Sequence, residues 1–181
     1  MDGGGSSSHL IFLTIANIAK PFDNKRMTDK NIVRAIVDEW LSDKEYFLVD
    51  THVDAQNKIT VEIDHKDGVW IDDCVELSRF IESKLDREVE DYELEVGSAG
   101  IGQPFKVIQQ YLNHVGKDVE VLTADGKKLK GTLNAADKEG FVLCCKEKVK
   151  VEGKKRPELQ DVEYPFGYQE VKSVKAVIDF K

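Results

Sequence analysis

The sequence contains little cysteine, which limits how the chain can be stabilised. Three of its 181 residues are cysteines: Cys74, Cys144 and Cys145. Their number is odd and they form no C-x-x-C motif, so an extracellular disulfide framework is not indicated. We therefore expect a reduced protein of the cytoplasm.

The sequence also lacks an apolar run long enough to cross a bilayer. The apolar stretch Leu10–Ala19 is about half the length of a membrane-spanning helix, which needs about 20 residues. The only charge before it is Asp2, whereas a secretory signal begins with a basic segment. We therefore expect no membrane partner.

Basic residues are scarce in the first two thirds of the chain. Residues 1–116 contain 12 Lys or Arg and 22 Asp or Glu, whereas residues 117–181 contain 14 and 12. The acidic part is poorly suited to hold a bare phosphate backbone. The nearly neutral second part can still carry a local basic patch.

Residues 1–26 form an atypical N-terminal extension. The run GGGSSS at residues 3–8 is typical of a flexible segment. Met27 follows the extension and directly precedes a helix start, so we interpret the extension as a misplaced start with Met27 as the initiator. The alternative is a disordered tail that carries a weakly docked helix.

Residues 27–97 show the pattern of a small α+β domain. Apolar residues recur at helical spacing in two segments and alternate with polar residues in three others. Thr28 is the expected N-cap of the first helix, and Asp72 and Asp73 are expected at the start of the second. In chain order, we expect a helix at 28–42, strands at 46–53 and 59–64, a helix at 72–85 and a strand at 92–96. This αββαβ order predicts a small sheet covered on one face by two helices.

An interdomain joint is expected at residues 98–114, after the strand that ends in YELEV. Glycines there allow positive φ angles, and a proline restricts the residue before it to extended geometry. The residues expected to form the hinge are Gly97, Ser98, Gly100, Gly102 and Pro104. A phosphate-binding loop is the alternative, but the spacing does not match G-x-G-x-x-G and no clear long helix follows.

Residues 115–181 are expected to form a small β-barrel domain of the SH3-like or Sm-like kind. Short strands separated by hairpin turns follow one another, with Ala124-Asp125-Gly126-Lys127 as the first turn. The expected strands are 118–122, 128–135, 141–151, 161–164 and 174–180, with a bend at residues 165–167. The predicted fold class of the whole chain is therefore α+β.

Three stretches of the chain resemble the ribosome maturation factor RimP family. The first is WIDDCVELSRFIESKLD after an Asp-Gly turn, the second is YELEVGSAGIGQP, and the third is GKDVEVLTADGKKLKGTL. The second is similar to the family's Ser-Ser-Pro-Gly-Leu-Asp-Arg-Pro signature. Positions that keep or approximate the signature are Ser98, Gly100, Ile101 and Pro104, and positions that depart from it are Gly97, Ala99, Gly102 and Gln103.

The resemblance implies a factor without catalytic activity that assists maturation of the small (30S) ribosomal subunit. The partners it implies are the immature 30S particle and the small-subunit protein at the decoding centre, with ribosomal RNA as a further candidate. We expect a monomer without cofactors. Gly102 and Gln103 replace the family's Asp-Arg pair, so any contact made by that pair would be absent here.

A run of cations in the second domain is the candidate partner-binding surface. It consists of Lys146, Lys148, Lys150, Lys154, Lys155 and Arg156. The first three alternate and would share one face of a strand. The alternative is a solvated face or a guarded edge strand. An Sm-like RNA-binding module used elsewhere in RNA metabolism is the alternative function.

No residue pattern indicates catalysis or a metal site. His52, His65 and His114 are scattered, whereas a metal needs several converging ligands. Asp72 and Asp73 are explained by the helix start. We therefore expect neither catalytic residues nor metal ligands.

The composition break at Met27 generates a first prediction. A chain that begins at Met27 should melt within about 5 °C of the full chain, because residues 1–26 are expected to add nothing to the core. Thermal melts followed by circular dichroism measure this, and a larger drop would show that the extension stabilises the fold.

Overall fold

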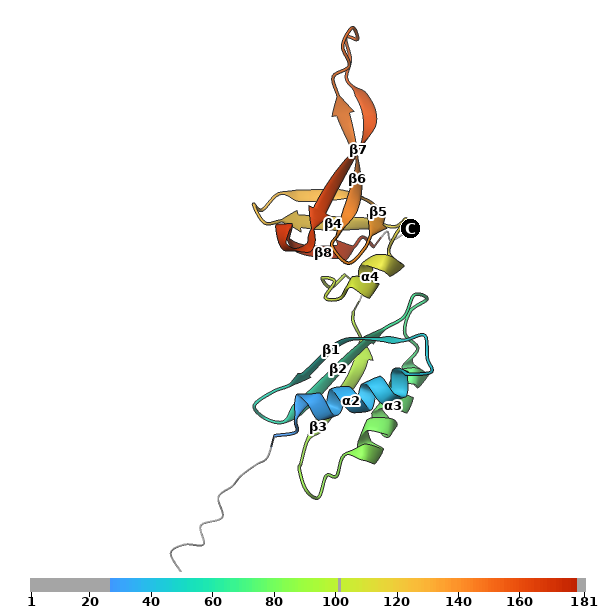
Figure 1. Ribbon diagram of the computed structural model, residues 1–181, viewed down its shortest axis with the longest axis vertical. Helices are drawn as coiled ribbons and strands as arrows, with labels where there is room; N and C mark the ends of the chain where they lie inside the picture. The colour runs from blue at the N-terminus through green and yellow to red at the C-terminus, as the bar shows by residue number, and fades with distance from the viewer. Residues whose placement is uncertain (1–26, 101, 179–181) are drawn as a thin grey trace, which may run out of the picture.

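The computed structural model describes residues 27–100 and 102–178, so both interpretations of residues 1–26 lie outside the described residues. Figure 1 shows a lower part of two helices packed on a small sheet and an upper part built mainly of strands. We name residues 27–98 the N-terminal unit and residues 105–178 the C-terminal unit. The predicted α+β class is confirmed.

The elements of the N-terminal unit are α2 (Lys30–Leu41), β1 (Phe47–Val53), β2 (Lys58–Asp64), α3 (Ile71–Lys84) and β3 (Glu93–Ser98). Those of the C-terminal unit are α4 (Ile108–Asn113), β4 (Asp118–Thr123), β5 (Lys128–Ala136), β6 (Gly140–Val149), β7 (Glu158–Gly167), the 3-10 turn η1 (Tyr168–Glu170) and β8 (Val171–Ala176). None of the described helices is long and apolar enough to cross a membrane.

The central strand of the N-terminal unit carries its core. β2 pairs antiparallel with β1 and parallel with β3. Ile59, Val61 and Ile63 alternate along β2 and are completely buried, because α2 and α3 lie over that face of the sheet (Figure 1). The helices contribute Val33, Ile36, Val37, Trp40, Leu77 and Ile81 to the same core.

The N-cap of α2 is Asp29, not Thr28 as predicted. The Asp29 side chain accepts a hydrogen bond from Asn31 N at 2.8 Å. Thr28 is buried instead, and its backbone N donates to Asn57 Oδ1 at 2.8 Å. Both residue types cap helices well, so the tertiary contact to Asn57 decided between them.

The start of α3 also differs from the prediction. Trp70 occupies the N-cap position and its side chain makes no capping hydrogen bond. Asp72 and Asp73 lie in the first turn, where their charge interacts favourably with the helix dipole. Helix α3 therefore begins without a side-chain cap.

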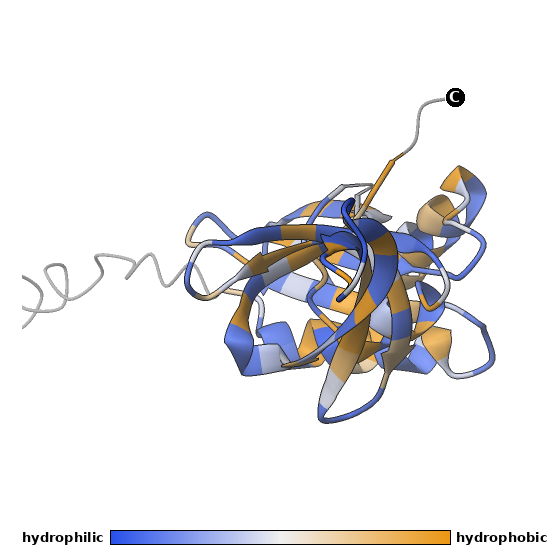
Figure 2. Ribbon diagram, turned by 90° about the horizontal axis from the view of Figure 1, so that it is seen from above, coloured by the Kyte–Doolittle hydropathy of each residue, from blue (hydrophilic) through white to orange (hydrophobic). Residues whose placement is uncertain are grey.

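The C-terminal unit is built on one antiparallel sheet with the strand order β7-β6-β5-β4-β8. Hydrophobic and hydrophilic residues alternate along its strands, as Figure 2 shows. The fully buried residues of its core are Val119, Val121, Leu133, Leu143 and Val174.

The expected closed barrel is not what the described residues show. The pairings of residues 118–176 leave β7 and β8 as the two edges of the sheet, with no ladder between them. β6 and β7 pair with each other over ten positions, and their hairpin extends away from the other strands (Figure 1). The outer part of this hairpin therefore has no third strand to pair with.

Strand β7 is longer than predicted. The expected strand 161–164 with a bend after it is one continuous strand that includes Pro165 and Phe166, and Phe166 pairs with Phe141. Proline is tolerated here because β7 is an edge strand and needs no donor on its outer side. β8 begins at Val171, earlier than predicted. The last two residues of the predicted strand 174–180 lie outside the described residues.

The close approach of β5 to β6 generates a stability prediction. A Cβ atom on Gly131 would lie 2.2 Å from the carbonyl oxygen of Cys144 and 3.0 Å from Cys145 Sγ. Gly131→Ala should therefore lower the free energy of unfolding by about 1–3 kcal/mol, measured by urea denaturation.

Gly97→Ala is the matched control for this variant. Gly97 also lies in a strand, but a Cβ there meets nothing within 4 Å. The control should unfold like the wild type. Equal stability of both variants would show that β5 and β6 can separate without cost.

Candidate functional site

The joint between the two units begins later than the sequence suggested. Gly97 and Ser98 belong to β3 and pair with β2. Ala99 N donates a hydrogen bond to the carbonyl oxygen of Ile63 at 3.1 Å, which extends this pairing by one residue. Of the predicted hinge residues, Gly100 is thus the first beyond the ladder.

Two glycines of the joint adopt backbone angles that favour glycine. φ is +63° at Gly100 and +79° at Gly102. Gln103 N donates to the carbonyl oxygen of Gly100 at 3.3 Å, which closes a turn before Pro104. Among the described residues, the part of the joint without strand pairing is thus Gly100 and residues 102–104.

The chain is fixed again directly after Pro104. Phe105 N donates to the carbonyl oxygen of Val174 in β8 at 2.7 Å. The buried side chain of Gln110 accepts hydrogen bonds from the backbone N of Lys106 at 2.6 Å and of Val107 at 3.2 Å. These bonds satisfy free donors at the start of α4.

Lys106 links the C-terminal unit back to the sheet of the N-terminal unit. Its Nζ lies 2.6 Å from Glu62 Oε2 on β2 and 3.1 Å from Asp50 Oδ2 on β1. Hydrogen bonds to Glu62 and Asp50 raise the pKa of Lys106, and the hydrogen bond from Lys106 lowers the pKa of Asp50. We call these three residues the Lys106 bridge.

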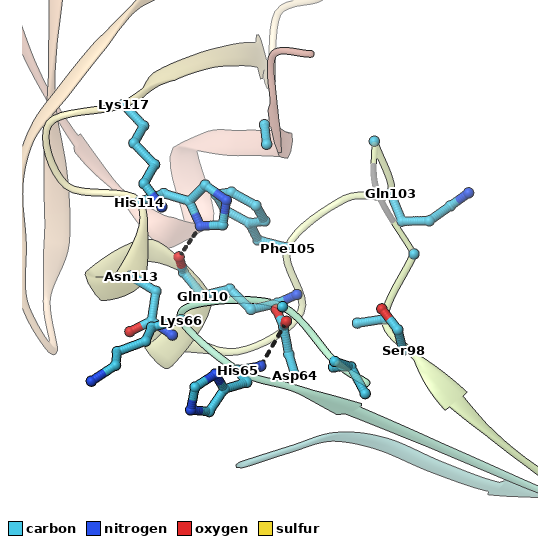
Figure 3. A pocket seen from close by; sticks show the side chains of 16 residues that line it. Asp64, His65, Lys66, Ser98, Gln103, Phe105, Gln110, Asn113, His114 and Lys117 are labelled. Atoms are coloured by element: carbon cyan, nitrogen blue, oxygen red, sulfur yellow. Dashed lines mark hydrogen bonds between the residues drawn. The ribbon is translucent and has the colours of Figure 1, made fainter. Parts of the chain in front are cut away.

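A pocket of about 340 Å³ lies beside the joint, where the two units meet (Figure 3). Asp64, His65 and Lys66 contribute to it from the end of β2, and Ser98 from the end of β3. The C-terminal unit contributes the lining residues Phe105, Gln110, Asn113, His114 and Lys117. The pocket lining mixes polar and apolar groups and carries charges of both signs.

The two histidines of this pocket are held by hydrogen bonds to the backbone. His114 Nδ1 lies 2.7 Å from the carbonyl oxygen of Gln110, so Nδ1 donates the proton. His65 Nδ1 accepts from Asp67 N at 3.1 Å, which leaves its Nε2 facing Glu45 at 3.5 Å. Among the described residues, neither ring hydrogen-bonds to a serine, threonine or cysteine that could act as a nucleophile. No three His, Cys, Asp or Glu residues within 27–100 and 102–178 converge to hold a metal ion.

The predicted cation run lies on the hairpin of β6 and β7. Lys146 and Lys148 are on β6, and the other four lie in the turn at residues 150–157. All six side chains are exposed. Lys146 faces Asp161 across the hairpin, and Lys154 forms an ion pair with Glu158 at 2.5 Å. We name residues 146–158 the basic hairpin tip; its cations are accessible but partly neutralised.

The sequence did not point to the Lys106 bridge or to the pocket beside the joint, which we call the junction pocket. Lys106 stands in an ordinary loop sequence, and its partners are 44 and 56 residues away. No local pattern could have revealed them.

The family model of the RimP N-terminal domain matches residues 36–102. A ribosome maturation factor RimP from Porphyromonas gingivalis is 44% identical over 138 residues, which cover 75% of this chain and 91% of that relative. The chain belongs to the RimP family. Relatives with the same name from Christiangramia forsetii and Cytophaga hutchinsonii are 34% and 30% identical, over 74% and 82% of this chain and 87% and 96% of their own lengths.

RimP family membership confirms the resemblance drawn from the three motifs. The matched region of the N-terminal domain model ends at Gly102, within the joint. The matches to the full-length relatives extend well beyond that point, because 138 residues exceed the length of the N-terminal unit.

The Lys106 bridge generates a prediction about the relative motion of the units. Lys106→Met should make the two units tumble more independently at neutral pH, because it removes both contacts to Asp50 and Glu62. NMR relaxation of backbone amides in each unit measures this. The global stability should change little, because partly exposed ion pairs contribute weakly.

The pH dependence of this motion follows from the pKa shifts. The lowered pKa of Asp50 means that its contact to Lys106 is present above the ordinary carboxyl pKa and is lost as the pH falls through the lowered value. The raised pKa of Lys106 means that the contact is lost at alkaline pH, above the raised value. Lys138→Met, an exposed lysine in the β5–β6 turn, is the control. Wild-type tumbling in Lys106→Met would contradict the role of the bridge.

Proposed function

We propose that this protein is a ribosome maturation factor that binds the immature small (30S) ribosomal subunit and assists its assembly. The observation that carries the proposal is the 44% identity to a ribosome maturation factor RimP over nearly the whole length of that relative. The proposed action is binding without catalysis and without a cofactor. Location in the cytoplasm and a monomeric state remain predictions.

The proposal includes a division into two domains. Residues 27–97 form the first and residues 115–181 a second domain of the SH3-like kind; the predicted joint of residues 98–114 between them also contains the end of β3 and helix α4. Two separate hydrophobic cores support this division, one around β2 and one around β4 and β6. The five antiparallel strands of the C-terminal unit are compatible with an opened SH3-like arrangement.

Two surfaces of opposite charge support a partner made of protein and RNA. The first part of the chain carries an excess of acidic residues, which favours a basic partner such as the small-subunit protein at the decoding centre. The basic hairpin tip projects from the rest of the molecule and offers cations to ribosomal RNA (Figure 1).

The second candidate function is an Sm-like RNA-binding module outside the ribosome. The six exposed cations of the basic hairpin tip favour it. Salt dependence separates the two functions, since direct RNA binding weakens steeply with salt whereas a contact made through protein need not.

The proposed function is tested by sedimentation with ribosomal particles. The wild type should sediment with free small subunits or their precursors in a sucrose gradient at low salt, and should be absent from translating 70S ribosomes. A wild type that stays at the top of the gradient would refute the ribosomal function.

A charge-reversal variant tests the basic hairpin tip. Replacing Lys146, Lys148, Lys154 and Lys155 by Glu should weaken association with the particle by roughly tenfold or more, since each lost phosphate contact reduces salt-dependent affinity. The matched control replaces Lys30, Lys128, Lys138 and Lys172, which are exposed elsewhere, by Glu. If both variants lose association equally, net charge rather than the hairpin is responsible. Circular dichroism verifies that both remain folded.

A further inference from the structure

Three neighbouring apolar residues at the start of α3 are exposed to solvent. Trp70 is 69% exposed, Ile71 81% and Val75 42%. Ile71 and Val75 lie one helical turn apart on the same face of α3, and Trp70 directly precedes that turn. We name these three residues the α3 apolar patch.

The α3 apolar patch is not a poorly packed region of the hydrophobic core. α3 buries Leu77 and Ile81 against the sheet, and Val69 packs against the same core just before the patch begins. The positions of Ile71 and Val75 fall on another side of the helix than those of Leu77 and Ile81. Single exposed apolar residues are common on protein surfaces, whereas three exposed apolar residues at one helix start, one of them a tryptophan, form a candidate interaction site.

The surroundings of the α3 apolar patch are strongly acidic. Segments 43–45 and 64–76 lie side by side, joined by ion pairs of Lys44 with Glu76 at 3.1 Å and of Lys66 with Glu45 at 3.4 Å. Together they contain seven acidic and two basic residues. The two lysines neutralise only two of these carboxylates, so the region keeps a net negative charge.

We propose that the α3 apolar patch docks a basic segment of a protein that carries an apolar anchor residue. The proposal rests on the proposed function, because an assembly factor needs a site for a ribosomal protein. An exposed tryptophan supplies a large contact area at low entropic cost, and tryptophan is enriched among the residues that dominate binding energy. The acidic residues steer a cationic chain to the patch and repel the phosphates of RNA.

The two tryptophans of the chain make the patch directly observable. Trp40 is 5% exposed in the core, whereas Trp70 lies in the patch. A Trp40→Phe variant therefore leaves Trp70 as the single indole fluorophore. Circular dichroism must first show that this variant is folded, since the Trp40 indole N–H donates to Glu76 Oε1.

The probe is a short synthetic peptide of alternating arginine and leucine, titrated into the Trp40→Phe variant. Trp70 emission should move to shorter wavelength and saturate, because binding removes the indole from water. A peptide with serine in place of leucine and one with glutamate in place of arginine should each bind at least roughly tenfold more weakly, a loss of about 1.4 kcal/mol.

Surface variants test which residues bind the peptide, with a fluorophore now placed on the peptide. Trp70→Ala and Ile71→Ser should each weaken binding at least roughly tenfold, and the pair Asp67→Asn and Asp72→Asn should reduce its salt dependence. Val89→Ala is the matched control, because Val89 is a 67% exposed apolar residue in the loop between α3 and β3. Its affinity should equal that of the wild type.

Four results would overturn the proposal. The first two are equally tight binding of the serine peptide, and unchanged affinity in Trp70→Ala and Ile71→Ser. The third is a shift of Trp70 emission caused by single-stranded RNA in place of the peptide. The fourth is an emission shift that grows with protein concentration alone, which would assign the patch to a second copy of the chain. If the wild type sediments with small subunits but binds no peptide, this proposal fails alone. If it does not sediment, the proposed function fails whatever the peptide does.

Discussion

The parallel pairing of β3 with β2 determines where the chain leaves the N-terminal unit. Parallel strands end at the same edge of a sheet, so the residues after β2 and those after β3 become neighbours. His65 and Lys66 therefore lie beside Ser98 and Gly100, although more than thirty positions separate them in the chain. The junction pocket and the joint both follow from this one pairing (Figure 3).

The predicted hinge is anchored by backbone hydrogen bonds on both sides. Ala99 continues the ladder of β3, and Phe105 is bonded to β8, so we expect any reorientation of the units to take place between these two residues. The Lys106 bridge spans the same gap from the other direction, and its atoms remain partly exposed. Water therefore competes with the bridge, which favours one orientation of the units without excluding others.

The spacing of apolar residues was sufficient to predict most helices and strands. An element that buries one face carries its apolar residues at the repeat of that element, which differs between helix and strand. The alternation of Ile59, Val61 and Ile63 identified β2, and these residues are completely buried. Element ends were less predictable, since Thr28 was drawn into a contact with Asn57, which lies 29 residues away in the chain. The long β7 could not be foreseen either, because proline is compatible with a strand only where that strand is at an edge.

Of the candidate site, the sequence revealed the cations of the basic hairpin tip and the glutamates among them, but not the residues that face them across the hairpin. The alternation of Lys146 and Lys148 placed them on one face, whereas their neighbours across the hairpin, Asp161 and Leu159, depended on a register that only the fold provides. The Lys106 bridge had no local signal, because its acidic partners are set by the pairing of β1 with β2. Contacts between units are thus the least accessible from sequence.

The α3 apolar patch also had no local signal in the sequence. Trp70 is the N-cap of α3 and Ile71 is its first residue, and a local pattern assigns such apolar residues to the core by composition alone. In the structure Trp70 and Ile71 are exposed, whereas Val69, directly before them, packs against the core. The exposed Trp70 side chain neither caps α3 nor packs in the core, so it contributes little to the stability of this unit. Its position is therefore better explained by contact with another molecule than by the stability of this chain.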